Sequence, residues 1–277
     1  MAKLIIEAGR TERNYWRDLW RYRELFVFLA WRDLLIRYKQ TTVGVAWAVL
    51  RPFLTMLVLT LMMRVSKLPG DGISPLPLFV YTAMLPWQFF STALSESGTS
   101  LITNSNLISK VYFPRLVVPA SSVITSFVDF AIAAVFTVFL MAWYGFMPPL
   151  THLAALPIFV LLTFGASFGA GLWIAALMVK YRDFRFVVPF MVQFGLYAAP
   201  VFIMTSSISE KFSEKWQLLY SLNPVVGIID GFRWSILGGH NLLYWPGQIA
   251  SVAGVAVLVS SGLWYFRKTE RSFADVI

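Results

Sequence analysis

Asn106-Leu-Ile-Ser-Lys-Val-Tyr-Phe-Pro-Arg115 is a short basic connector between two long apolar runs, residues 76–100 and 116–143. It carries one lysine, one arginine and no acid. Residues 107–113 are long enough for about two turns of helix, which would end near Pro114 because the residue before a proline disfavours the helical region. The pattern predicts a small basic helix that projects from a bundle of membrane helices. The alternative is a charged loop that only fixes membrane topology.

The runs beside this connector belong to a set of six. The chain has 277 residues, of which 58% are hydrophobic and 13% are charged, whereas a soluble domain carries about 25% charged residues. Each run reaches or approaches the ~20 residues that a spanning helix needs. The runs are residues 43–63, 76–100, 116–143, 153–179, 186–204 and 249–266. We therefore expect an all-α integral membrane protein, with six transmembrane helices in a single domain over residues 1–277.

The first 42 residues are polar and basic, with nine cations against five acids. One helical face within them is aromatic and apolar, and the other is charged. The apolar face holds Tyr15, Trp16, Leu19 and Trp20, and the charged face holds Arg13, Arg17, Asp18, Arg21 and Glu24. This arrangement predicts an amphipathic interface helix that lies among lipid headgroups. The alternative is an ordinary positively charged anchor.

The cations are divided unevenly between the two sides of a six-span chain. With a cytoplasmic N-terminus, the inner segments hold 17 lysines and arginines and the outer segments hold 5. Because positive charge marks the cytoplasmic side, we expect a multi-pass protein of the cytoplasmic (inner) membrane with both termini in the cytoplasm. The net charge of +9 follows this topology, so nucleic acid is not an expected partner.

Residues 216–238 are too broken and too polar for a seventh span. We expect two short helices hinged at Asn223-Pro224, which dip into the outer leaflet without crossing it. Asp230 and Arg233 are three residues apart and could pair on one helix face. The alternative is an ordinary surface helix followed by an extracytoplasmic loop.

A few ionisable side chains interrupt the apolar runs, and they are expensive to place in a membrane. They are Arg51, Glu96 and Asp129. One interpretation is that Arg51 and an acid neutralise each other between helices, and the others are a proton relay or a polar lining for a hydrophilic substrate. The small residues of segment 165–169 predict close helix contact within the bundle rather than at a dimer face.

Several kinds of chemistry are excluded by the residues themselves. The chain has no cysteine, and its two histidines, His152 and His240, are far apart, so no metal site is indicated. It never reads Gly-Lys-Ser or Gly-Lys-Thr and so lacks the nucleotide-binding loop that would let it hydrolyse ATP alone. We expect no cofactor in this chain and no catalytic residue. Energy for active transport would enter through another polypeptide.

A series of short motifs occurs in a fixed order along the chain. They are Arg32-Asp33-Leu-Leu-Ile-Arg37-Tyr38-Lys39-Gln40, Val43-Gly44-Val-Ala-Trp47, Arg51-Pro52, Lys110-Val-Tyr-Phe-Pro114-Arg115, Tyr181-Arg182-Asp183, Ala199-Pro200-Val201-Phe202, and Asn223-Pro224 with Phe232-Arg233. In order and spacing the chain resembles the membrane permease of type-2 ABC exporters that move O-antigen, capsular polysaccharide or teichoic acid. The resemblance covers nearly the whole chain.

The resemblance implies a homodimer bound to two copies of an ABC ATPase, which would hold ATP and magnesium. The substrate would be a polysaccharide linked to undecaprenyl pyrophosphate. The basic connector then resembles the ATPase coupling helix, with Leu107, Lys110, Val111, Tyr112, Phe113 and Arg115. The broken segment resembles the re-entrant gate helices of the outer mouth, with Asn223, Pro224, Asp230 and Arg233.

Two further predictions concern the path of the substrate. Arg32, Arg37 and Lys39 precede the first apolar run and could attract a lipid diphosphate at its cytoplasmic entrance. Flat rings stack on sugars, so a glycan conduit would use the aromatic residues of the runs. The alternative is that these rings face lipid or pack in the core. The candidates are Trp47, Phe53, Trp87, Phe90, Phe194 and Tyr197.

Three other function classes fit parts of the sequence. A type-2 ABC permease for a small drug or lipid would share the topology and would lack a ring-lined conduit. A membrane glycosyltransferase would need paired carboxylates in a loop, and the longest outer loop offers only Glu210, Glu214 and Asp230. A passive structural protein leaves the basic connector unexplained.

Overall fold

A computed structural model of the chain describes residues 15–39, 44–67, 72, 74–202, 205, 213–238, 243–270 and 273. Over these residues the regular structure is helical throughout. The helices are α1 Tyr15–Arg21, α2 Arg23–Lys39, α3 Ala46–Val65, α4 Leu76–Thr103, α5 Ser105–Lys110, α6 Val117–Trp143, α7 Leu150–Leu153, α8 Leu156–Lys180, α9 Phe184–Ala198, α11 Glu214–Ser221, α12 Pro224–Ile236 and α13 Trp245–Thr269.

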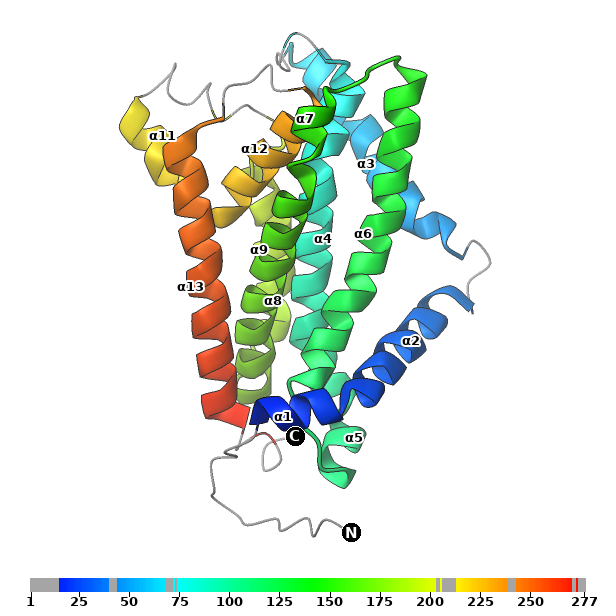
Figure 1. The fold of residues 1–277 in the computed structure, drawn as a ribbon, viewed down its shortest axis with the longest axis vertical. Helices are drawn as coiled ribbons and strands as arrows, with labels where there is room; N and C mark the ends of the chain where they lie inside the picture. Colours follow the sequence, from blue (N-terminus) through cyan, green and yellow to red (C-terminus); the bar gives the residue numbers. More distant parts are fainter. Residues whose placement is uncertain are drawn as a thin grey trace.

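The long helices form a bundle whose two ends carry different short helices (Figure 1). α1 and α5 lie at one end, together with the last turn of α13, and we call this the α5 end. α7, α11 and α12 lie at the other, which we call the α12 end. The expected basic connector and the expected hinged pair of helices are therefore at opposite ends of the molecule.

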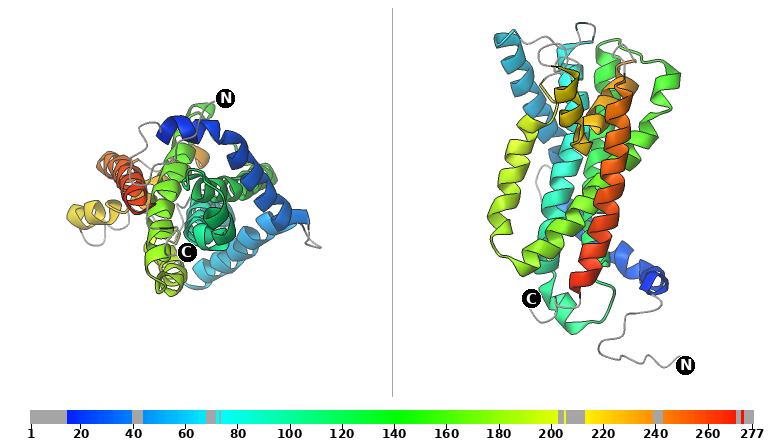
Figure 2. Two further views of the ribbon diagram at one scale, coloured as in Figure 1. Left: turned by 90° about the horizontal axis from the view of Figure 1, so that it is seen from below. Right: turned by 90° about the vertical axis from the view of Figure 1, so that its left-hand side faces the viewer.

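α4 is the central helix of the bundle (Figure 2, left) and is buried along most of its length. Its second half is rich in serine and threonine, and most of these hydroxyls donate to carbonyls of the same helix three or four residues earlier, as Ser95 does to Ser91 at 3.0 Å. A polar helix of this kind is tolerated in a membrane protein when its neighbours, rather than lipid, surround it. α6, α8, α3 and α12 supply that surround.

Four of the described helical stretches are long and apolar enough to cross a membrane. They are Ala46–Val65, Val117–Trp143, Leu150–Lys180 and Trp245–Thr269. α4 has the length, with 28 residues, but is not among the stretches with enough hydropathy to span a membrane. α9 is apolar but has only 15 residues, which reach ~22 Å at 1.5 Å per residue. The all-helical membrane character is confirmed, and the count of six spans remains a prediction.

The expected interface helix is divided into α1 and α2, which meet at a bend at Tyr22. Tyr15 is buried, with the guanidinium of Arg267 on α13 lying 4.5 Å from its ring centre. Trp16 and Trp20 are exposed. The predicted apolar face is thus split between a protein contact and the surface. Arg13, which belongs to the predicted charged face, lies outside the described part of the chain.

α8 and α13 touch backbone to backbone through glycine, as the small residues of segment 165–169 predicted. A Cβ atom built on Gly169 would lie 2.6 Å from the carbonyl carbon of Leu258, and one on Gly262 would lie 2.5 Å from the carbonyl oxygen of Gly169. Such close approach lets van der Waals contacts hold helices together where lipid gives no hydrophobic driving force.

Gly169→Val is expected to lower the thermal midpoint of the detergent-purified protein, because the new side chain must push the two backbones apart. Overpacking of this kind costs about 1–3 kcal/mol or more. Ala131→Val is the control, since it ends in the same valine side chain at an exposed position of α6. Equal midpoints for the two variants would contradict the tight α8–α13 contact.

Candidate functional site

The projecting segment at the α5 end is a helix followed by an extended stretch. The helix is α5, Ser105–Lys110, and Val111 is extended with φ −128° and ψ 133°. The prediction of a helix over residues 107–113 was therefore wrong in its bounds. The helix ends at Lys110, before the position at which Pro114 would have ended it. The extended residues that follow turn Phe113 back towards the bundle, where it is buried.

The coupling candidates fall into an exposed set and an anchoring set. Lys110, Val111 and Tyr112 are exposed, with 50% of Tyr112 accessible. Phe113, at 4%, and Ile108 are buried in a cluster that also holds residues of α8 and α13. Phe113 is therefore an anchor of the segment, and its neighbours present the surface that a partner could reach.

The other two candidates on this segment are partly buried. Leu107 packs against the same cluster as Phe113. The backbone N–H of Arg115 donates to Oε1 of Glu270 at 2.8 Å, and its guanidinium donates to the carbonyl oxygen of Glu270. The last residue of the segment is thus fixed to the end of α13.

α2 contributes a cation that holds two acids of the bundle together. The guanidinium of Arg37 forms ion pairs with Glu96 on α4 and Asp129 on α6. Tyr38 donates its hydroxyl to Asp129, and Ser126 donates to Oε2 of Glu96 at 2.9 Å. We call Arg37, Tyr38, Glu96 and Asp129 the ionic cluster.

The charges of the ionic cluster reinforce one another. Burial works against the charged form of Arg37, but Glu96 and Asp129 more than offset it, so the pKa of the guanidinium is raised. Burial, and then Asp129, raise the pKa of the Tyr38 hydroxyl, which therefore stays protonated as a donor. The cluster fastens the C-terminal end of α2 to the middle of the bundle.

Within the described residues Arg51 forms no ion pair with an acid, so the interpretation that it neutralises one between helices is not supported. Arg51 is exposed, and its guanidinium lies 5.9 Å from the ring centre of Trp47, one turn earlier on α3. Glu96 and Asp129 pair with Arg37 instead. α2 runs beside α6, so the C-terminal end of α2 lies close to these two acids. Sequence separation hid this partner, since Arg37 lies outside the apolar runs.

The three basic residues expected at the cytoplasmic entrance have different surroundings. Arg32 donates to Oδ1 of Asp33 at 2.7 Å and to Oδ1 of Asn104 at 2.8 Å, while Arg37 is in the ionic cluster. Lys39 is exposed. Asn104, the residue between α4 and α5, was not singled out from the sequence because nothing local marks it as the partner of α2.

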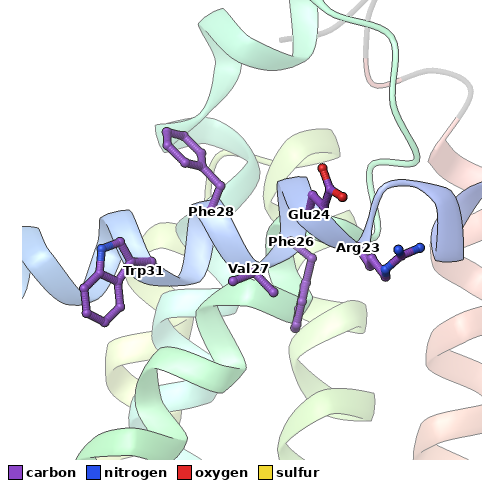
Figure 3. Close-up of a pocket in the computed structure, with 6 residues that line it drawn as sticks. All are labelled: Arg23, Glu24, Phe26, Val27, Phe28 and Trp31. Atoms are coloured by element: carbon purple, nitrogen blue, oxygen red, sulfur yellow. The ribbon is translucent and has the colours of Figure 1, made fainter.

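A shallow apolar hollow lies along α2 (Figure 3). Its volume is about 530 Å³, and it is lined by Arg23, Glu24, Phe26, Val27, Phe28 and Trp31. Phe28 and Trp31 extend from α2 in different directions, and both are 61% exposed. α2 therefore bears apolar side chains on its outward face as well as on the face towards α6.

The six aromatic conduit candidates are not brought to one surface. Trp47, Phe194 and Tyr197 are exposed on α3 and α9. Phe53 packs edge-on against Phe136 of α6. Trp87 is buried against α9, where a Cβ on Gly195 would lie 2.5 Å from its ring, and Phe90 is the ring beside it.

The α12 end contains the two short helices that the sequence predicted. Asn223 separates α11 from α12 and accepts from the N–H of Val225 at 3.2 Å, so it caps α12, which begins at Pro224. An Asn cap followed by proline at the first helical position is a favoured helix start. α12 is almost wholly buried among α4, α8 and α13.

Arg233 is the buried cation of α12. It is 3% exposed and donates from Nη2 to the carbonyl oxygen of Val201 at 2.9 Å. Its guanidinium carbon lies 3.9 Å from the ring centre of Phe79 on α4. Asp230 lies one turn earlier and is partly buried. Arg233 thus ties α12 to the turn that follows α9 and to the first turn of α4.

Comparison with known proteins identifies the family. The family model for the ABC-2 type transporter matches residues 24–237. The O-antigen export system permease protein RfbA of Myxococcus xanthus is 29% identical over 261 residues, covering 94% of this chain and 98% of that protein. A protein of the same name from Klebsiella pneumoniae is 28% identical over 264 residues, covering 92% and 95%. This chain therefore belongs to the ABC-2 type transporter family.

Proposed function

We propose that this chain is the membrane permease of an ATP-driven polysaccharide exporter. Two copies would assemble with two ABC ATPases and move a polysaccharide on undecaprenyl pyrophosphate from the inner to the outer side of the cytoplasmic membrane. The family match and the two relatives named as O-antigen export permeases support this class. Six spans with both termini in the cytoplasm are part of the proposal, supported by the distribution of charge along the chain.

The observation that carries the proposal is the build of the segment at the α5 end. Ile108 and Phe113 anchor it in the buried cluster, while Lys110, Val111 and Tyr112 project. A short, rigid element with one exposed aromatic residue and one cation suits a docking contact, because aromatic anchors dominate protein interfaces. The ATPase would press on this surface, and Arg115 would hold the segment to α13.

Substrate would reach the bundle near α2. Lys39 is the cation of the three candidates that faces outward, and the ionic cluster holds α2 in place beneath it. Attraction of an anionic headgroup is worth about 1 kcal/mol per basic side chain near the surface. Lys39 would attract the diphosphate, and Arg32 and Arg37 would position α2, the helix that carries Lys39.

The conduit would form between two copies of the chain at the face of α3 and α9, which lie on the same side of α4 (Figure 2). Four exposed rings, Phe186, Phe190, Phe194 and Tyr197, follow one another at helical spacing along α9. The rings of Phe190 and Phe194 lie 4.2 Å apart. Such a strip offers flat surfaces to sugars, and α11 and α12 would close its outer end.

Reconstitution of the chain with its ATPase in vesicles tests the proposal through export of a lipid-linked glycan. Tyr112→Ala is expected to keep the thermal midpoint of the parent and to lose most glycan export while ATP is still hydrolysed, because the exposed ring makes the docking contact. Phe113→Ala is the comparison, since truncating a buried phenylalanine costs about 3–5 kcal/mol. It should lower the midpoint. Normal export by Tyr112→Ala would remove the coupling role.

A further inference from the structure

α13 connects the α5 end, where the proposed function places the ATPase contact, to the α12 end, where it places the gate. It runs from α11 and α12 to the α5 end without interruption (Figure 1). Its 25 residues span ~37 Å at 1.5 Å per residue. Continuous helix is stiff along its axis, so a displacement applied at one end reaches the other if both ends are attached.

The attachment at the α5 end is made by Glu270, the residue directly after α13. Its Oε1 accepts from the backbone N–H of Arg115 at 2.8 Å, and its carbonyl oxygen accepts from the Arg115 guanidinium. Phe266, one turn earlier on α13, is fully buried in the same cluster as Phe113. The end of the projecting segment and the end of α13 therefore move as one piece.

The attachment at the α12 end is made by the first turns of α13. Gln248 is buried and donates from Nε2 to the carbonyl oxygen of Gly227 on α12 at 2.9 Å. A Cβ on Gly227 would lie 2.2 Å from Oγ of Ser251, and one on Gly247 would lie 2.8 Å from Oγ of Ser221 on α11. No room is left for α11 or α12 to slide along α13.

We propose that α13 is a rigid strut that carries a displacement of segment 106–115 directly to the gate helices α11 and α12. Glu270 and Gln248 are the positioning residues that fasten its two ends. The inference rests on the proposed function, which gives the segment its ATPase contact and the short helices their role as a gate. It adds a route between them that does not pass through the central helix α4.

The absence of cysteine from the chain allows a single reporter to be introduced at the gate. Leu222→Cys places a thiol at the junction of α11 and α12, where the native side chain is 60% exposed. The complex with its ATPase is reconstituted, and the rate of labelling by a membrane-impermeant maleimide is measured with and without vanadate-trapped nucleotide. We expect this rate to change severalfold on trapping.

Glu270→Ala is expected to abolish that change and to leave both ATP hydrolysis and the nucleotide-free labelling rate close to those of the parent. Glu270→Gln keeps an acceptor oxygen for the Arg115 N–H and should restore the response. Glu24→Ala is the matched control, since it removes an exposed carboxylate from the same end of the molecule. Gln248→Leu, at the far end of α13, should give the same loss as Glu270→Ala, and the double variant should be no worse than either.

Two results would overturn the strut, and they differ in what else they overturn. A full nucleotide response in both Glu270→Ala and Gln248→Leu removes the strut and leaves the proposed function intact. No response in the Leu222→Cys parent removes the gate role of α11 and α12, and with it the strut. Where Glu270→Ala does not fold, Gln248→Leu decides the question alone.

Discussion

Arg37→Glu is expected to reduce the yield of folded protein and to abolish export. The guanidinium of Arg37 now pairs with two carboxylates, and the change would put a third carboxylate in its place. Breaking a buried ion pair costs about 3–5 kcal/mol, and partial exposure lowers this to about 1–3 kcal/mol. The lower range applies here, since 26%, 32% and 25% of the side chains of Arg37, Glu96 and Asp129 remain accessible. The thermal midpoint and the glycan export rate measure the two effects.

A set of companion variants separates the ionic cluster from attraction of a lipid headgroup. Arg37→Lys keeps the charge but replaces a planar fork by a single point donor, so it should be intermediate in stability. The triple variant Arg37→Gln, Glu96→Gln, Asp129→Asn removes every charge and should regain most of the midpoint lost in Arg37→Glu. If the triple variant is stable and exports glycan, Arg37 acts by holding α2. If it is stable and does not export, the cation has a role towards substrate.

The elements of the fold were predictable because they depend on local pattern. Apolar runs gave α3, α6, α8 and α13 their positions, and the Asn223-Pro224 pair marked the start of α12 from its capping chemistry alone. The glycine contact of α8 was also readable, since small residues four apart have few other uses in an apolar helix. Each of these inferences needed only residues that are close in the chain.

The pairing of groups was not predictable because it depends on how helices lie across one another. Arg37 meets Asp129 across 92 positions of sequence, and no periodicity records that α2 crosses beside α6. The sequence showed that two acids needed a cation, and it offered the nearest one in an apolar run, Arg51. The orientation of Phe113 was missed for a similar reason, because it is set by the buried cluster and not by the proline that follows.

The central helix shows the limit of hydropathy as a guide. α4 is less hydropathic than the four helical stretches that could span a membrane, yet α3, α6, α8 and α12 surround it. Hydropathy measures suitability for lipid, and a helix enclosed by protein does not meet that solvent. Glu96 of α4 is tolerated for the same reason, because it lies between helices and pairs with Arg37 of α2.

Arg233→Leu is expected to destabilise the α12 end. It should also make the thiol of Leu222→Cys react rapidly with maleimide whether or not nucleotide is bound. The change leaves the carbonyl oxygen of Val201 without its 2.9 Å donor and removes the cation from the ring of Phe79. It also takes away the positive charge one turn from Asp230. Losing a buried charged hydrogen bond and its ring contact costs about 2–5 kcal/mol. The readouts are the thermal midpoint and the nucleotide-free maleimide labelling of Leu222→Cys.

Arg64→Leu is the matched control for this prediction, because it removes an exposed arginine from the last turn of α3, a helix that ends near the α12 end (Figure 1). Arg233→Lys can still donate to Val201 but cannot lie flat over Phe79, so it should fall between the parent and Arg233→Leu. Adding Asp230→Asn to Arg233→Leu removes the charge left behind and should recover part of the midpoint. A labelling rate in Arg233→Leu that matches the Arg64→Leu control would show that Arg233 stabilises α12 without holding the gate shut, since a gate latch must alter access as well as stability.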